Sequence, residues 1–281
     1  MQSFKIRMRA LPLAAFGLAS ASLAYGDSPP SPMHAATYAD LADLADGAPL
    51  VIKAQVRKLA PVDSLRAPGL RAGWGRFYVE AKTEALVAGA VPIGEALRYL
   101  VDLPLDAKGK PPSLKKQSVV LFARTVAGRP SELQLVAPDA QLRWDPVLDG
   151  KLRGVLTELL AVGAPGKVSG VREAIYVPGN LAGESETQLF LAMANGEPAA
   201  LTVTRRPGQP PRWSVSFSEV VGASGNSPAR ETLAWYRLAC FLPPLLPAGA
   251  NISDNPVDRA AAGVDYRYVV TELGICQRTR R

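Results

Sequence analysis

Short apolar runs of strand length, separated by proline and glycine, recur along most of this 281-residue sequence. The clearest is Trp213–Ser218, in which three apolar residues alternate with three serines. Because successive side chains of a strand point to opposite faces, this alternation predicts a strand with one buried and one exposed face. A chain with many such runs and few helical stretches is expected to be mainly β with a few helices, of the α+β class.

The first half of the chain contains five of these strand patterns, with turn residues between them. They are 50–56, 77–84, 97–103, 118–123 and 132–136. The second alternates and is rich in aromatic residues, the turn after it reads V-x-x-G at 91–94, and a proline- and lysine-rich loop leads to the fourth, VVLF at 119–122. In this order of strands, residues 48–136 resemble the OB-type barrels of many exported bacterial proteins. The resemblance implies a five-stranded barrel, a fold that binds proteins, sugars or nucleic acids in different proteins.

The N-terminal segment has the three parts of a secretory signal peptide. Lys5, Arg7 and Arg9 precede an apolar run at 10–25, and small residues before Asp27 form a cleavage site after residue 26. An earlier site at 19–21 and an uncleaved anchor are the alternatives, although a spanning helix needs about 20 apolar residues. We therefore expect export to the periplasm or beyond, with 1–26 removed and the proline-rich residues 27–36 acting as a tether. As a whole, the chain resembles exported bacterial proteins that carry no functional assignment, which implies only the same compartment.

The net charge argues against a nucleic-acid partner. Removing the three basic residues of the signal peptide lowers the formal charge from +7 to +4, too small a surplus for a nucleic-acid footprint. After signal cleavage no other apolar stretch has the length of a transmembrane span.

The two cysteines, Cys240 and Cys276, both lie in the last fifth of the chain. In an exported protein such a pair is expected to form a disulfide, here closing a loop of about 35 residues worth roughly 4 kcal/mol. Two buried free thiols are the alternative. The spacing differs from the C-x-x-C of a redox motif.

Two helices are expected to accompany the barrel. Thr37 and Asp40 form a capping-box pattern that opens a helix ending at Gly47, and an apolar stripe predicts a second helix over 147–162. We place a domain boundary at 163–166, which gives an OB-like domain at 37–163 and a second domain at 164–281.

The second domain is expected to be an antiparallel sheet packed by one helix. Its four strand candidates are 168–177, 187–193, 200–205 and 213–221. Ser227 and Pro228 predict the start of a helix that runs to about Leu242 and packs on the apolar face of the sheet.

A shortage of histidine excludes several kinds of catalysis. The single histidine, His34, lies in the predicted tether. Ser-His-Asp and Cys-His systems need an imidazole, and zinc sites with histidine ligands need one too. We therefore assign no catalytic residue, no metal ligand and no cofactor.

The most distinctive polar segment is the loop between the strands that start near 168 and 187. It offers Tyr176, Asn180, Glu184 and Glu186 as candidate binding residues. A plain hairpin loop is one interpretation, a binding loop is another, and the two glutamates could also form an acid–base pair acting on a sugar. The leading hypothesis is a non-enzymatic binding or structural module for an envelope protein or glycan. The alternative is a histidine-independent hydrolase of envelope polymers that uses the paired carboxylates.

Overall fold

The computed structural model describes residues 36–218 and 226–280. The predicted signal peptide, residues 27–35 of the predicted tether with His34, and the end of the predicted strand at 213–221 lie outside this range.

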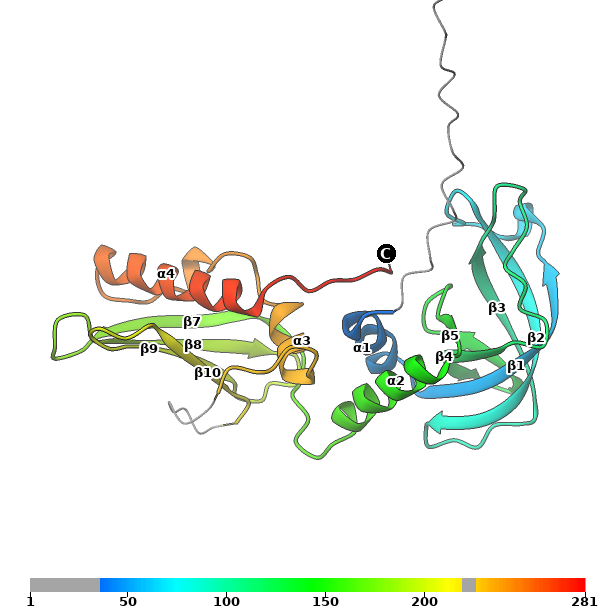
Figure 1. The fold of residues 1–281 in the computed structure, drawn as a ribbon, viewed down its shortest axis with the longest axis horizontal. Helices are drawn as coiled ribbons and strands as arrows, with labels where there is room; N and C mark the ends of the chain where they lie inside the picture. Colours follow the sequence, from blue (N-terminus) through cyan, green and yellow to red (C-terminus); the bar gives the residue numbers. More distant parts are fainter. Residues whose placement is uncertain (1–35, 219–225, 281) are drawn as a thin grey trace, which may run out of the picture. The chain divides into compact units, whose positions relative to one another are not determined.

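A five-stranded β-barrel forms the N-terminal part, as predicted (Figure 1). The strand order is β1-β2-β3-β5-β4, and β4 pairs again with β1. Only β3 and β5 run parallel, so the barrel is mixed. A short strand that the sequence analysis missed, β6, pairs with β4 beyond the end of β5. The strands are β1 (Leu50–Pro61), β2 (Trp74–Ala88), β3 (Ala96–Pro104), β4 (Ser118–Val126), β5 (Arg129–Leu135) and β6 (Gln141–Arg143).

The burial of the barrel strands follows their sequence patterns. In β2 the residues Phe77, Val79 and Ala81 face the interior and alternate with more exposed neighbours. Strand β4 is buried continuously from Val119 to Ala123, because other strands pair with it on both edges and both of its faces are covered. These patterns are local, so the sequence could reveal them.

Two helices pack against each other beside the barrel, α1 (Tyr38–Asp46) and α2 (Pro146–Leu159). The predicted capping box is confirmed, since the Thr37 hydroxyl accepts from the amide of Asp40 and the Asp40 carboxylate accepts from the amide of Thr37. Helix α2 ends earlier than predicted. Leu160, expected in its apolar stripe, is 72% exposed.

The second half contains a four-stranded antiparallel sheet, in the order β10-β9-β8-β7, also as predicted. One detail of the predicted alternation is wrong: Ser214 in β10 is buried rather than exposed. Its partner in the register, Thr202 of β9, is buried as well, so this part of the sheet is covered on both faces. The strands are β7 (Val168–Pro178), β8 (Ser185–Met193), β9 (Ala200–Arg205) and β10 (Arg212–Ser216).

One helix packs on this sheet, but it is not the predicted one. Helix α4 (Pro256–Leu273) contacts β7 and β8, and Figure 1 shows it running along the sheet. The segment expected to do so forms only a short helix, α3 (Leu233–Ala239), which contacts α1, α2 and α4. The predicted start at Pro228 fails because Glu231 has a φ of 58°, outside the helical region, so the helix begins only after Thr232 caps it.

The sequence of α4 gives no clear helical pattern, because part of the buried face of this helix is polar. Asp265 is fully buried and accepts hydrogen bonds from Thr187 at 2.5 Å and from Arg205 at 2.6 Å, both on the sheet. A carboxylate in the middle of the buried face weakens the apolar periodicity from which a helix is predicted.

The buried apolar side chains form one connected cluster that extends from the barrel through α1, α2 and α3 to the sheet. Within 36–218 and 226–280, every helix falls short of the length and apolar character that crossing a membrane requires.

Candidate binding site

The four residues selected from the sequence lie on one hairpin. Tyr176 is in β7, Asn180 and Glu184 are in the β7–β8 turn, and Glu186 is in β8. Asn180 is exposed and the other three are partly buried.

Both glutamates take part in hydrogen bonds within this hairpin, and Glu186 also pairs in register with Thr204 of β9. The amide of Glu184 donates to the carbonyl of Leu181 at 2.9 Å, and its own carbonyl accepts from the amide of Gly179 at 2.8 Å. The Glu186 carboxylate accepts from the side chain of Gln188 at 2.7 Å. These bonds stabilise the turn and the start of β8. The binding and catalytic roles of the hairpin stay predictions.

A groove that the sequence analysis did not identify lies on the outer face of the barrel, where β3 and β5 diverge. In this part of the chain the two strands pair in register only at Arg98 and Glu132. Farther along β3, the amide of Asp102 donates to the carbonyl of Pro138, in the segment that follows β5, at 2.7 Å. Between these points the wall opens into a groove of about 590 Å³. This volume is in the range of ligand-binding clefts.

The floor of this groove is mainly apolar. Leu100 of β3 is 50% exposed and stands opposite Tyr78 of β2 in the register, so both side chains lie on the outside of the barrel. Val126 and Val136 contribute from the far side of the opening. A leucine this exposed inside a concave surface is typical of a site that another molecule covers.

Three arginines line the groove, and two of them have no partner among the residues that the structure describes. The Arg76 guanidinium is held by two bonds to the Asp102 carboxylate, at 2.7 and 2.9 Å, which raise the pKa of Arg76. Arg98 and Arg124 are exposed, and neither forms a hydrogen bond or an ion pair with any residue that the structure describes. The groove therefore combines an apolar floor with two free positive charges.

One sequence signal could have located this groove. The predicted strand 97–103 has an apolar inner face, but its outer face carries Arg98, Leu100 and Asp102. This leucine, on an otherwise charged outer face, is the local sequence feature that coincides with the groove. The opening itself depends on how β3 and β5 diverge after Arg98 and Glu132, which are 34 positions apart in the sequence. A local sequence pattern does not encode this divergence.

A second hollow, of about 340 Å³, continues the groove toward the C-terminal tail (residues 274–280). It shares Arg124, Val136 and Ala137 with the groove, and its far side is formed by Asp139 and Arg280. The Arg280 guanidinium donates to the carbonyl and the carboxylate of Asp139, both at 2.9 Å. The last described residue of the chain thus forms part of this surface.

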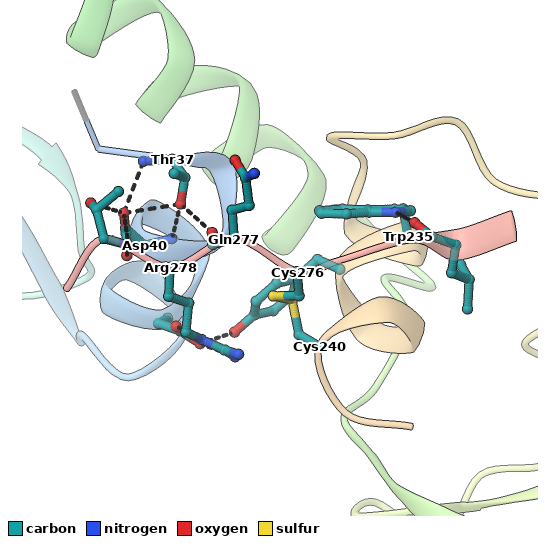
Figure 2. The surroundings of a disulfide bond; sticks show 11 residues. Thr37, Asp40, Trp235, Cys240, Cys276, Gln277 and Arg278 are labelled. Atoms are coloured by element: carbon teal, nitrogen blue, oxygen red, sulfur yellow. Dashed lines mark hydrogen bonds and ion pairs between the residues drawn. A yellow bond between two sulfur atoms is a disulfide. The ribbon is translucent and has the colours of Figure 1, made fainter. Parts of the chain in front are cut away.

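The predicted disulfide is confirmed and holds the C-terminal tail. Cys240 at the end of α3 bonds to Cys276 at an S–S distance of 2.01 Å (Figure 2). On one side of the bond the indole of Trp235 donates to the carbonyl of Leu273. On the other side the Thr37 hydroxyl donates to the carbonyl of Gln277.

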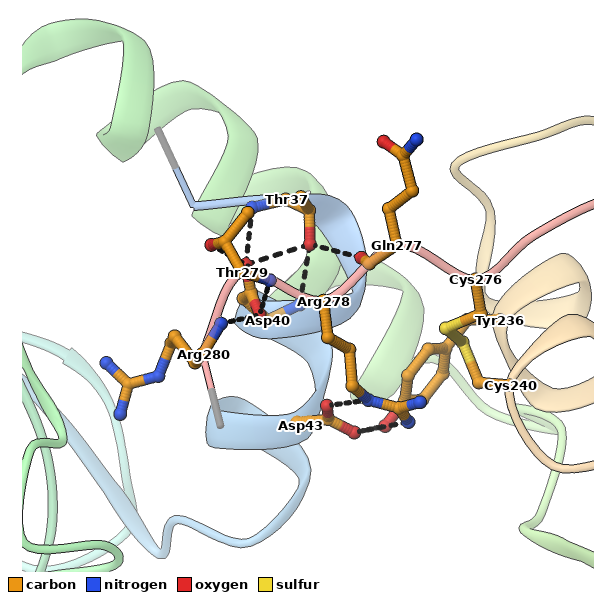
Figure 3. A network of polar contacts seen from close by, with 10 residues as sticks. All are labelled: Thr37, Asp40, Asp43, Tyr236, Cys240, Cys276, Gln277, Arg278, Thr279 and Arg280. Atoms are coloured by element: carbon orange, nitrogen blue, oxygen red, sulfur yellow. Dashed lines mark hydrogen bonds and ion pairs between the residues drawn. A yellow bond between two sulfur atoms is a disulfide. The ribbon is translucent and has the colours of Figure 1, made fainter. Parts of the chain in front are cut away.

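Three aspartates of α1, spaced every third residue, connect the helix to the C-terminal half. Figure 3 shows two of them, Asp40 and Asp43. Asp40 accepts from the amides of Thr279 and Arg280 at 3.0 and 3.1 Å. Asp43 accepts from the Tyr236 hydroxyl and from the Arg278 guanidinium, both at 2.6 Å. The third, Asp46, pairs with the buried Arg237 and with Lys167.

These contacts lower the pKa of two of the aspartates. Burial by itself would raise the pKa of Asp40, but the hydrogen bonds from Thr279, Thr37 and Arg280 outweigh it and hold the value below the ordinary range. Asp46 behaves in the same way, because the bonds and charges of Arg237 and Lys167 outweigh its burial. Both groups are ionised at neutral pH.

The disulfide is consistent with an oxidising compartment. Among the described residues, no group of three or more His, Cys, Asp or Glu side chains is arranged to hold a metal ion. Neither a comparison with protein-family models nor one with curated proteins finds a match to this chain.

Proposed function

We propose that this protein is a non-enzymatic binding module, and that it recognises a protein or glycan partner of the cell envelope in the groove between β3 and β5. One observation carries the proposal: Leu100 is half exposed in a concave surface of about 590 Å³, beside two arginines that have no partner within the described part of the chain. An exposed apolar floor together with unpaired charges favours the interpretation that a ligand covers this groove.

The barrel is proposed to be of the OB type. Its five strands in the order β1-β2-β3-β5-β4, closed by β4 on β1 and partly open between β3 and β5, support this assignment. In OB barrels the face of the second and third strands is a common ligand surface, and here Tyr78 and Leu100 lie on it. Export through the N-terminal signal peptide is part of the same proposal, and the disulfide supports it.

The chemistry of the groove favours a protein partner over a glycan. Apolar residues from three strands form the floor, and an apolar surface rimmed by polar residues is typical of a protein interaction site. The guanidinium groups of Arg98 and Arg124 would pair with carboxylates. The expected ligand is an extended segment with an apolar side chain and at least one acidic group.

The test compares two double variants with the same change of charge. R98E/R124E reverses both groove arginines. R66E/R267E is the matched control, because Arg66 and Arg267 are exposed, line neither hollow of the groove and form no described ion pair. Each oxidised mature protein is immobilised and incubated with envelope extract of its own organism, and the bound proteins and glycans are quantified.

We expect the wild type and R66E/R267E to retain the same stoichiometric partner and R98E/R124E to lose it. If R98E/R124E retains that partner as well as the control does, the groove is not the binding surface.

A further inference from the structure

A separate cleft lies where the start of α1, one face of α2 and residues 230–231 meet. It consists of two adjoining hollows, of about 670 and 170 Å³. Both are lined by Tyr38, Lys151 and Glu231, and neither shares a residue with the groove on the barrel. The cleft thus offers a site that is independent of the proposed function.

Charges of both signs line this cleft without neutralising each other. Lys151, Arg230 and Glu231 are exposed, and none of them forms a hydrogen bond or an ion pair with the residues that the structure describes. Exposed opposite charges gain little by pairing directly in water. Here charges of both signs line one hollow, so one small molecule with both charges could pair with them.

The hydroxyl of Tyr38 adds an unsatisfied polar group. It is buried beside the Glu158 carboxylate, and it forms no hydrogen bond of good geometry with the described residues. Burial first, and then the neighbouring Glu158 carboxylate, raises the pKa of Tyr38, so the hydroxyl stays neutral and able to donate. Buried polar atoms without a partner are rare in folded proteins, and a ligand is one of the ways in which they become satisfied.

The backbone around the cleft is strained in one place and tightly packed in another. Glu231 adopts a φ of 58°, which non-glycine residues seldom do. Next to it, the Arg230 guanidinium lies so close to Gly274 that a Cβ at residue 274 would collide with it. The strained residue lies in the segment that presents both charges, and such strain is concentrated at functional sites.

We propose that this cleft binds a small zwitterion, such as an α-amino acid or a dipeptide. The carboxylate of the ligand would pair with Lys151 and Arg230, and its ammonium group would pair with Glu231. The Tyr38 hydroxyl would gain its missing partner from the same molecule. A single charge would satisfy only one side of the cleft.

Calorimetric titration of the oxidised protein tests this directly with alanine and alanyl-alanine. Acetate and ethylammonium serve as fragments with one charge each. We expect saturable binding of at least one zwitterion, at least about tenfold tighter than either fragment, since each fragment loses one set of charge-assisted bonds. Absence of saturable heat up to ~10 mM, a concentration that would detect even millimolar affinity, refutes the proposal. So does equal binding of a zwitterion and a fragment.

Single variants assign the residues. Lys151→Gln and Glu231→Gln should each weaken binding by about tenfold or more, whereas the matched controls Lys115→Gln and Glu272→Gln should not change it. Tyr38→Phe separates a ligand role from a structural one: a ligand role predicts weaker binding with an unchanged or raised melting temperature. If Tyr38→Phe and both charge variants bind like the wild type, the cleft is not the site, and the proposal for the barrel groove is unaffected.

Discussion

Opening the Cys240–Cys276 bond is expected to lower the free energy of unfolding by about 4 kcal/mol. The bond joins residues 36 positions apart. For a loop of that length the chain-entropy relation gives an entropy loss of about 13 cal/mol/K in the unfolded state, which is about 4 kcal/mol at 25 °C. The folded state also depends on the bond, because Cys276 anchors the C-terminal tail, whose residues pair with Asp40 and Asp43.

The assay is urea unfolding of the oxidised wild type, the reduced wild type and the C240A/C276A variant, followed by tryptophan fluorescence. The reduced protein and the variant should unfold at the same urea concentration, well below that of the oxidised protein, and reductant should leave the variant unchanged. A difference of less than about 1 kcal/mol between oxidised and reduced protein would refute the reasoning, because it would mean that the loop is already constrained without the bond.

Four other perturbations have defined outcomes. Stability should fall as the pH drops below about 5, because the pKa values of Asp40 and Asp46 are lowered in the fold and their ionised forms stabilise it above those values; an acid titration followed by circular dichroism should be flatter for D40N/D46N. Leu152→Ala should cost about 2–5 kcal/mol because this side chain of α2 is fully buried. Leu160→Ala, at a residue 72% exposed, should cost less than about 0.5 kcal/mol in the same urea assay. Asp265→Ala leaves a sheet arginine without its buried partner and should cost about 3–5 kcal/mol; an unchanged unfolding midpoint would contradict this account of α4.

The features that the sequence could predict are those with short-range causes. The capping box of α1 spans four residues, and the alternation in β2 and β3 repeats every two. Both are visible in a local window. The disulfide was predictable for another reason, since a chain with two cysteines leaves only one intramolecular pairing.

The features that the sequence could not predict depend on distant partners. Helix α4 buries Asp265 because Thr187 and Arg205 satisfy the carboxylate from strands at least 60 residues away. Helix α3 begins late because the backbone turns at Glu231. The barrel groove exists because β3 and β5 diverge, and only the exposed Leu100 on the outer face of β3 gives a sequence hint of it.

The bonds between α1 and the C-terminal tail also bear on the order in which the chain folds. Thr279 and Arg280 lie 239 and 240 positions after Asp40, so these contacts are among the most non-local in the chain. Contacts of such separation form late, because closing the intervening loop costs entropy before any bond rewards it. During synthesis from the N-terminus, Asp46 can pair with Lys167 and Arg237 before the tail is made, whereas the bonds from residues 278–280 to Asp40 and Asp43 form only afterwards. Docking of the tail is therefore expected to be a late step of folding.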